Sequence, residues 1–393
     1  MLEKALSIMK KPLVLMLATF FAATVEVYSA PAIGTTQACP TGIAVGSSTS
    51  VTITSAISDP TVIPTSVNLL RLSASGAASV IGQLNDNGSN GDVTAGDRVF
   101  SGRFSFKEAK AGSLRLQVSA AFKGVSTPIV SEAMTIAVRN RATDLVGIWD
   151  GNIWRRYAAT GSWVLIAGSG AVQVAAGDLD GDGIDDLVGT WPNSGVWVRY
   201  SLTGSWASLS TAVPQSIASG DLDGDGKSDV LGVFDGKIWC RYSTSKSWVL
   251  VGGTGAKQVA AGDLDGDGLD DLIVAWLNNG VWAKNSLTGR WTSLSDTVPQ
   301  SIATGEFDGD GKSDVLGIWD GNIWCRYSAR GTGVLIAGPG ASEVAAGDLD
   351  GDGIDDPVGT WQSGLWVKYS QTGRWVSLST TAPRAITTMN VWR

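Results

Sequence analysis

Hydrophobic and polar residues alternate over short segments along most of the chain, and the segments end at glycine, aspartate, asparagine or serine. Within residues 172–210 they are "VQVAAGD", "LVGTW", "GVWVRYS" and "SWASLS". Short alternating runs rich in Val, Thr and Trp, bounded by turn residues, predict β-strands. In alternate copies an Asp-Gly pair forms the second turn, a strong hairpin signal, at Asp150-Gly151, Asp235-Gly236 and Asp320-Gly321. The pattern therefore predicts an all-β protein.

This four-segment pattern is repeated. An acidic string of the form D-x-D-G-D-G-x-x-D recurs every 42 or 43 residues, starting at Asp178, Asp221, Asp263, Glu306 and Asp348. The segment "ATDLVGIWDGNIWRRYA" (142–158) keeps the strands but lacks the acidic string, as does the final "RAITTMNVW" (384–392). Four strands per repeat of this length are typical of propeller blades. Because a lone four-stranded unit cannot bury both of its faces, we expect the units to stack in a ring.

The repeats fit a six-bladed β-propeller over residues 134–393, with a seven-bladed ring as the alternative. The innermost strand of the first blade is expected from "MTIAVRN" (134–140) or from the C-terminal "RAITTMNVW". We favour the C-terminal segment, because it would close the ring by pairing the two ends of the repeat region.

Residues 31–133 have a different character, with no Trp and no copy of the repeat. Alternating runs such as "SVTITSAI" (50–57) and "SLRLQVSAAF" (113–122) predict an immunoglobulin-like β-sandwich. The stretch "LNDNGSNGDVTAGDRVF" (84–100) fits either a calcium-binding loop or a long polar hairpin, and we favour the hairpin.

The N-terminal residues 1–30 are predicted to be a secretory signal peptide. Lys10 and Lys11 precede a 14-residue apolar run, which is short for a membrane span, and a small residue precedes Pro31. Translation is expected to start at Met1 or Met9. The mature protein is predicted to be bacterial and secreted, extracellular or at the cell surface, with the periplasm as an alternative. No transmembrane anchor is expected after signal cleavage.

Composition and charge exclude several classes of function. The net charge of −8 argues against a nucleic-acid partner, since phosphate binding needs a basic surface. The absence of histidine excludes Ser-His-Asp and Cys-His catalytic sites and His-ligated zinc. Three cysteines are too few for a disulfide framework, and Cys240 and Cys325, both in "IWCRY", are interpreted as small apolar residues of the core.

The acidic string has the chemistry of a calcium loop. Calcium binds six to eight hard oxygen atoms, and alternate residues of a tight loop can turn three carboxylates inward. Glycine at the sixth position permits the bend that brings the chain back. In the first copy the ligands would be the side chains of Asp178, Asp180, Asp182 and Asp186 and the carbonyl of Ile184. Without a cation such carboxylates would repel one another.

Two other interpretations of the acidic string fit it less well. The EF-hand needs a carboxylate at position 12 between two helices, but Gly189 and its equivalents stand there and strands follow. Five solvated acidic turns without metal would not require the same spacing five times. About five Ca²⁺ ions are therefore expected. They would bring the net charge of residues 31–393 from −9 to about +1.

The loops resemble the FG-GAP/VCBS repeats of integrin-α-like β-propellers over about residues 134–393. The resemblance implies a propeller in which each calcium loop joins the first two strands of a blade, with calcium in a structural role. It also implies no calcium in the first unit, where Ile136, Val138 and Asn140 stand at ligand positions, and a weaker site at Glu306. Matched by position, the remaining predicted ligands are Asp221, Asp223, Asp225, Lys227 (carbonyl) and Asp229; Asp263, Asp265, Asp267, Leu269 (carbonyl) and Asp271; Glu306, Asp308, Asp310, Lys312 (carbonyl) and Asp314; and Asp348, Asp350, Asp352, Ile354 (carbonyl) and Asp356.

Tryptophan is abundant, at 17 residues, and regularly placed. The third strand of most units reads Trp-x-Arg/Lys-Tyr, which puts the Trp and the basic residue on one face of the strand. These pairs either pack between blades, which we favour, or bind sugars, as in some fungal propeller lectins that the pattern distantly resembles. The candidate glycan-binding residues are Trp154 and Arg156, Trp197 and Arg199, Trp239 and Arg241, Trp282 and Lys284, Trp324 and Arg326, and Trp366 and Lys368.

The function predicted from these patterns is a secreted, calcium-binding protein of adhesion or of glycan or protein recognition, with no catalysis. Its partner would be a glycan or an extracellular protein. One alternative is a hydrolase or lyase acting on polysaccharide, since paired carboxylates hydrolyse glycosides, but nearly all carboxylates lie in the metal loops. The other alternative is a purely structural surface or matrix protein.

Overall fold

The computed structural model describes residues 30–45, 49–139 and 141–392. The predicted signal peptide lies outside this part of the chain, apart from Ala30. The described residues form 33 strands and a single turn of 3-10 helix, η1 (Pro64–Ser66), which confirms the all-β class. Among them, no helix has the length and apolar character needed to cross a membrane.

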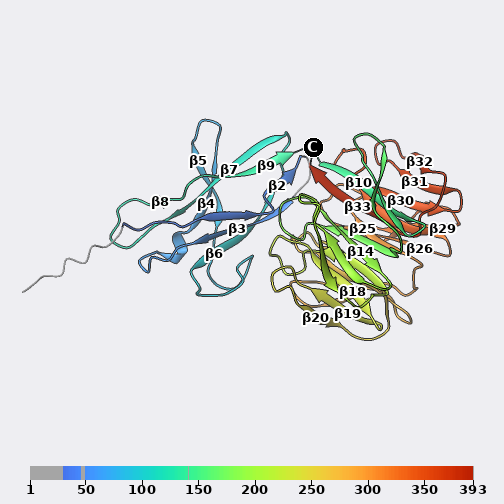
Figure 1. Cartoon of the computed structure of the whole chain (residues 1–393). Helices are drawn as coiled ribbons and strands as arrows, with labels where there is room; N and C mark the ends of the chain where they lie inside the picture. The colour runs from blue at the N-terminus through green and yellow to red at the C-terminus, as the bar shows by residue number, and fades with distance from the viewer. Residues whose placement is uncertain (1–29, 46–48, 140, 393) are drawn as a thin grey trace, which may run out of the picture. The chain divides into compact units, whose positions relative to one another are not determined.

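The repeat region consists, in the described residues, of six four-stranded antiparallel sheets (Figure 1). From the innermost strand outward, the first sheet contains β33 (Ile386–Trp392), β10 (Arg141–Trp149), β11 (Asn152–Arg156) and β12 (Trp163–Ala167). The second contains β13 (Gln173–Gly177), β14 (Asp186–Trp191), β15 (Gly195–Arg199) and β16 (Trp206–Ser210), and the third β17 (Ser216–Gly220), β18 (Asp229–Phe234), β19 (Lys237–Arg241) and β20 (Trp248–Gly252). The fourth contains β21 (Ala256–Gly262), β22 (Asp271–Trp276), β23 (Gly280–Lys284) and β24 (Trp291–Ser295). The fifth contains β25 (Ile302–Gly305), β26 (Asp314–Trp319), β27 (Asn322–Arg326) and β28 (Gly333–Ala337), and the sixth β29 (Ala341–Gly347), β30 (Asp356–Trp361), β31 (Gly364–Lys368) and β32 (Trp375–Ser379).

The innermost strands contact one another in cyclic order. β13 lies against β17, β17 against β21, β21 against β25 and β25 against β29, and β33 contacts both β29 and β13. Each sheet therefore has a neighbour on both faces, which is the arrangement of a β-propeller and the solution expected for units that cannot bury both faces alone.

The two ends of the repeat region close this cycle. β33 pairs with β10 in antiparallel register, from Arg141 opposite Trp392 to Gly147 opposite Ile386 (Figure 1). The C-terminal segment therefore supplies the innermost strand of the first sheet, as favoured from the sequence. The competing segment forms β9 (Met134–Arg139), which pairs with strands of the N-terminal region instead.

The boundary between the two regions consequently differs from the predicted one. Ile136 and Val138 of β9 are buried in the N-terminal core. The chain therefore passes from the N-terminal region to the repeat region near residue 140, and not between residues 133 and 134. An alternating apolar strand fits either region by pattern alone. The deciding contacts are made with residues distant in sequence.

The Asp-Gly hairpins have the predicted turn. Asp150, Asp235 and Asp320 have φ values of 50°, 49° and 51°, and the glycines that follow them also have positive φ. Positive φ at both central residues defines the type I′ turn, whose twist matches that of the flanking strands.

The N-terminal region contains two sheets. One consists of β1 (Thr36–Cys39), β3 (Thr49–Ala56) and β6 (Val99–Phe106). The other consists of β2 (Gly42–Ala44), β9, β7 (Gly112–Ala120), β4 (Asn68–Leu72) and β5 (Ala78–Gln83), with β8 (Ile129–Val130) beside β7. Both sheets contribute to a single hydrophobic core that includes Ile53, Phe100, Leu69 and Leu116.

Aromatic pairs fill the space at the outer strands of the propeller sheets. Trp191 of β14 meets Trp206 of β16 edge to face, with ring centroids 5.6 Å apart, and the same pairing recurs in four other sheets. Room for Trp191 comes from Gly189, where an added Cβ would lie 2.7 Å from the indole. The "G-x-W" of these strands is therefore a packing device, in line with the favoured interpretation of the tryptophans.

One buried carboxyl departs from the repeat. Glu343 of β29 stands where the second and fourth sheets carry Gln173 and Gln258. The Ser301 hydroxyl donates a hydrogen bond of 3.0 Å to its carboxyl group. Burial nevertheless raises the pKa of Glu343 to about 7, because the charged form loses its hydration.

We predict that Glu343→Gln stabilises the protein above neutral pH. Since the folded-state pKa lies above the unfolded value of 4.5, the wild type loses stability as pH rises from about 4.5 through 7. The variant is expected to escape this loss and to be more stable at pH 8 by on the order of 1–3 kcal/mol, with little difference at pH 5. Urea denaturation in saturating calcium at both pH values measures the effect.

The matched control is Gln258→Glu, which places a carboxyl at the equivalent position of the fourth sheet. It is expected to lower stability at pH 8 more than at pH 5. Equal pH dependence in the wild type and Glu343→Gln would contradict the assignment.

Candidate metal centres

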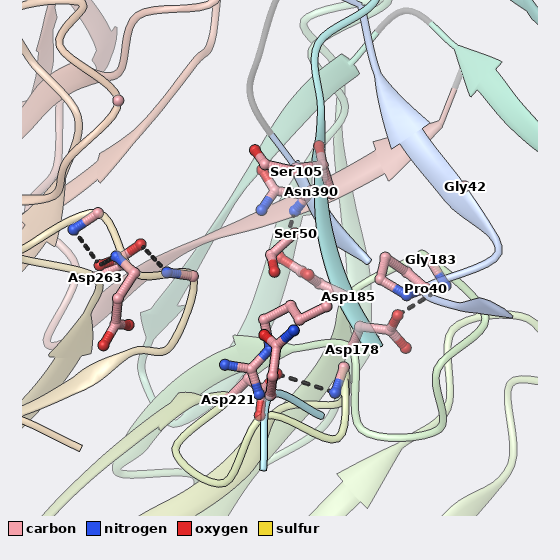
Figure 2. Close-up of a pocket in the computed structure, with 18 residues that line it drawn as sticks. Pro40, Gly42, Ser50, Ser105, Asp178, Gly183, Asp185, Asp221, Asp263 and Asn390 are labelled. Atoms are coloured by element: carbon pink, nitrogen blue, oxygen red, sulfur yellow. Dashed lines mark hydrogen bonds between the residues drawn. The ribbon is translucent and has the colours of Figure 1, made fainter. Parts of the chain in front are cut away.

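Each acidic string forms a loop between the first and second strands of a sheet, organised by its first residue. Asp178 accepts hydrogen bonds of 2.7 Å from the backbone N–H groups of Gly181 and Gly183. Asp221, Asp263 and Asp348 accept the equivalent pair of bonds, and Figure 2 shows the first three aspartates. Gly181 and Gly183 have φ of 84° and 87°, so glycine is needed at both bends.

The fourth loop departs from this geometry. Its first residue, Glu306, accepts bonds from the N–H groups of Asp308 and Gly309, both through Oε1. The longer side chain therefore shifts the pattern towards the start of the loop, in keeping with the expectation that this site is atypical.

The loops bring predicted ligand oxygens together. In each of four loops, one carboxylate oxygen from each of three residues lies within 4.8 Å of the other two. The groups are Asp178, Asp180 and Asp186; Asp221, Asp223 and Asp225; Asp263, Asp265 and Asp267; and Glu306, Asp308 and Asp314. The residue at the seventh position, such as Ile184, donates its N–H to the fifth-position aspartate. That its carbonyl binds the metal stays a prediction.

The ninth-position aspartate is the most buried member of each loop. Asp186, Asp229, Asp314 and Asp356 are fully buried, and Asp271 is 3% exposed. Asp186 ties two segments together, accepting bonds from the N–H of Leu179 in the loop and of Ser201 after β15. In the other four sheets with an acidic loop, a serine N–H likewise donates to the ninth-position aspartate.

These carboxyl groups are electrostatically strained without a cation. Burial, reinforced by neighbouring carboxylates, raises the pKa of Asp186, Asp229 and Asp356 to about 8, 8 and 7. It also raises the pKa of Asp178 and Asp221 to about 7 and 8. Groups that hold protons near neutral pH for this reason are stabilised in their charged form by a bound cation.

The donor set fits calcium. Every converging side chain is a carboxylate, the hard oxygen ligand that Ca²⁺ prefers, with no nitrogen or sulfur ligand among them. Two buried oxygens, Asp182 Oδ2 and Asp308 Oδ1, have no hydrogen-bond partner. A buried carboxylate oxygen that faces no donor is costly in a folded protein, and a cation would satisfy it.

The first sheet, which has no acidic string, satisfies the same buried carboxylate differently. Asp144 occupies the ninth position, 2% exposed, and accepts a bond from the N–H of Ala158 as its counterparts do from serine. The guanidinium of Arg155 lies beside it, with nitrogen atoms 2.7 Å from Asp144 Oδ2. The other sheets carry Val, Cys or Ala in place of Arg155. The Arg155 side chain thus supplies the positive charge in the first sheet that a bound metal would supply in the other five.

The loops also join neighbouring sheets, from the second to the sixth. The N–H of the eighth residue of one loop donates to the carbonyl of the first residue of the preceding loop, as from Ser228 to Asp178 at 2.7 Å and from Asp270 to Asp221 at 2.8 Å. A second hydrogen bond joins the same two residues, because the N–H of Asp221 donates to the carboxyl group of Asp270. In the first sheet Asn390 takes the place of the first loop residue, exchanging such bonds with Asp185.

Sequence reasoning missed these linking residues. Arg155 carried a signal, as a basic residue at an otherwise apolar position in the unit that lacks the acidic string. The eighth-position residues alternate between Asp and Ser, which marked the double repeat but not its bonds.

The candidate glycan-binding pairs lie on the third strand of each sheet, as predicted. Their basic residues face the first residue of the fourth strand, which is Trp in five sheets, as in Arg156 opposite Trp163. The third-strand tryptophans are partly buried in five sheets, whereas Trp324 is 37% exposed. The role of these pairs, in packing or in sugar binding, stays a prediction.

Comparison with known proteins supports the repeat. Residues 221–274, which contain two of the acidic strings, match the FG-GAP-like repeat family. Together with the cyclic order of the sheets, this match defines a β-propeller repeat protein. No curated protein matches the chain in sequence.

Similar solved structures include one chain of the mitotic checkpoint complex, with a TM-score of 0.39 and 10% identity over 63% of this chain and 83% of that one. A chain of the complex of BBS1N with ARL6DN has a TM-score of 0.38 and 13% sequence identity, over 65% of this chain and 86% of that one. The Pan2 WD40 domain of Neurospora crassa has a TM-score of 0.35 and 10% sequence identity, over 64% of this chain and 88% of that one.

We predict that Arg155→Met destabilises the protein by about 3–5 kcal/mol, because it leaves Asp144 buried without its partner. Urea denaturation in saturating calcium measures the loss. Arg156→Met, the neighbouring arginine on the other face of β11, is the control and is expected to change stability by less than about 1 kcal/mol. The double variant Asp144→Asn with Arg155→Met should recover part of the loss; additive effects would refute the coupling.

Proposed function

We propose that this chain is a secreted six-bladed β-propeller with an immunoglobulin-like N-terminal sandwich. Its acidic loops bind five calcium ions in a structural role. Its surface recognises an extracellular ligand, a glycan in the first instance, and the chain does no catalysis.

The observation that carries the calcium proposal is the contrast between the first sheet and the others. Five sheets have a buried ninth-position aspartate beside an acidic loop, and the first sheet has the same aspartate beside Arg155. In the sheet without an acidic loop, a fixed cation lies beside the buried aspartate. We infer that the same aspartate also needs a cation in the sheets that have the loop. Calcium would supply positive charge and oxygen coordination and would hold each loop to the adjoining strands.

We predict that removal of calcium with EGTA lowers the melting temperature by at least about 10 °C. Binding at 100 times the dissociation constant contributes about 2.7 kcal/mol per site, and several sites act on the same folded state. Differential scanning calorimetry with and without EGTA tests this, with readdition of calcium and of magnesium as controls. An unchanged melting temperature would refute structural calcium.

The stoichiometry gives a matched test at a single site. Wild-type protein is expected to bind five calcium ions by equilibrium dialysis, and Asp356→Asn four, since it removes a fully buried loop carboxylate. Arg155→Met should leave the number at five, because the first sheet has no loop. A stoichiometry of zero in the wild type would contradict the proposal.

The proposal of recognition is supported by the tryptophans and basic residues that recur on the third strands, near pockets between sheets. A glycan array run in calcium and in EGTA tests it. Calcium-dependent binding to defined sugars is the expected result. Absence of binding would contradict the proposal that the ligand is a glycan. Turnover of polysaccharides in a panel would favour an enzyme instead.

A further inference from the structure

The fifth sheet breaks the aromatic pattern of the ring at one position. Its fourth strand, β28, begins with Gly333, where the other five sheets have Trp. Trp319 of β26 therefore has no edge-to-face partner, in contrast to its equivalents in the other sheets.

The same substitution changes what lies opposite a basic residue. Arg326 lies opposite Gly333 in the strand register, whereas Arg156 lies opposite Trp163. Among the described residues, Arg326 makes no ion pair and no side-chain hydrogen bond. Trp324, two residues before it, is one of the two most exposed tryptophans, at 37%.

A pocket of about 420 Å³ occupies this place, between the fourth and fifth sheets. Its walls include Trp319, Trp324, Leu294, Asn322, Thr297 and Arg326. Trp319 is held in position because its indole N–H donates to the Thr297 carbonyl at 3.1 Å. The volume lies within the usual range of small-ligand sites, and a few polar groups among aromatic walls are their usual lining.

The corresponding pocket of the first sheet shows what Gly333 changes. It is lined by Trp149, Trp154 and Trp163, and Arg156 is not part of its wall. Trp163 covers the equivalent space there. In the fifth sheet, unlike the first, the pocket wall therefore includes a guanidinium group.

We propose that this pocket binds one neutral pyranose residue of a glycan; the inference rests on the glycan recognition proposed above and assigns it to a single site. The C–H face of a pyranose carries partial positive charge and stacks on the negative face of an indole. Its hydroxyl groups both donate and accept, which suits a lining with the donor Arg326 and the acceptor Asp320. A purely anionic sugar would instead meet the charge of Asp320.

The test fills the pocket. Gly333→Trp restores the residue of the other sheets, and the backbone accepts it, because a Cβ there meets only Trp324, at 4.0 Å. The probe is the neutral oligosaccharide bound most strongly on the glycan array, measured by isothermal titration. We expect one site per wild-type chain and at least tenfold weaker binding by Gly333→Trp at unchanged melting temperature.

Two further variants complete the design. Gly253→Trp adds an indole at an open position of the third sheet and should bind as the wild type does. Trp163→Gly opens the equivalent space beside Arg156 and should raise the stoichiometry to two.

The outcomes separate this inference from the broader proposal. Unaltered binding by Gly333→Trp, a wild-type stoichiometry of five or six, or selective binding of acidic sugars would overturn the single neutral-sugar site and leave glycan recognition standing. Absence of any glycan binding would overturn both.

Discussion

The ring depends on how it balances the charge of an aspartate that is buried in each sheet. In every sheet that aspartate lies on the second strand and accepts an N–H group from the turn after the third, so it ties the two strands together. A buried carboxylate is stable only when a cation or several donors balance it. Arg155 provides that balance in the first sheet, and the acidic loops concentrate oxygen ligands for a metal in the others.

The same loops carry the contacts between sheets, which couples local electrostatics to ring closure. The bond from Ser228 to the Asp178 carbonyl, and its equivalents, run from one loop to the next. A loop that opened for lack of a cation would therefore release its neighbour as well as its own strands. Asn390 makes the equivalent bonds to Asp185, so the first sheet is joined to the second although it lacks the acidic string.

Much of this architecture could be predicted from the sequence, because the repeat supplies its own internal alignment. Strand positions, the Asp-Gly turns and closure by the C-terminal segment followed from periodicity and turn chemistry. The placement of β9 did not, since Ile136 and Val138 fit either region by pattern and are fixed by partners distant in sequence. Ligand convergence was predictable from spacing, whereas the Arg155–Asp144 pair required two residues eleven positions apart to be brought together on adjacent strands.

Symmetry explains why the departures are the informative positions. A residue that recurs around the ring is constrained first by packing, as the pairing of Trp191 with Trp206 over Gly189 shows. Such a residue says little about a ligand. Gly333 removes the edge-to-face partner of Trp319 at a single junction, and the pocket there is lined by Arg326 and by the exposed Trp324. A loss of packing confined to one of six equivalent places, and accompanied by exposed groups able to contact a ligand, favours a functional interpretation of that place over the other five.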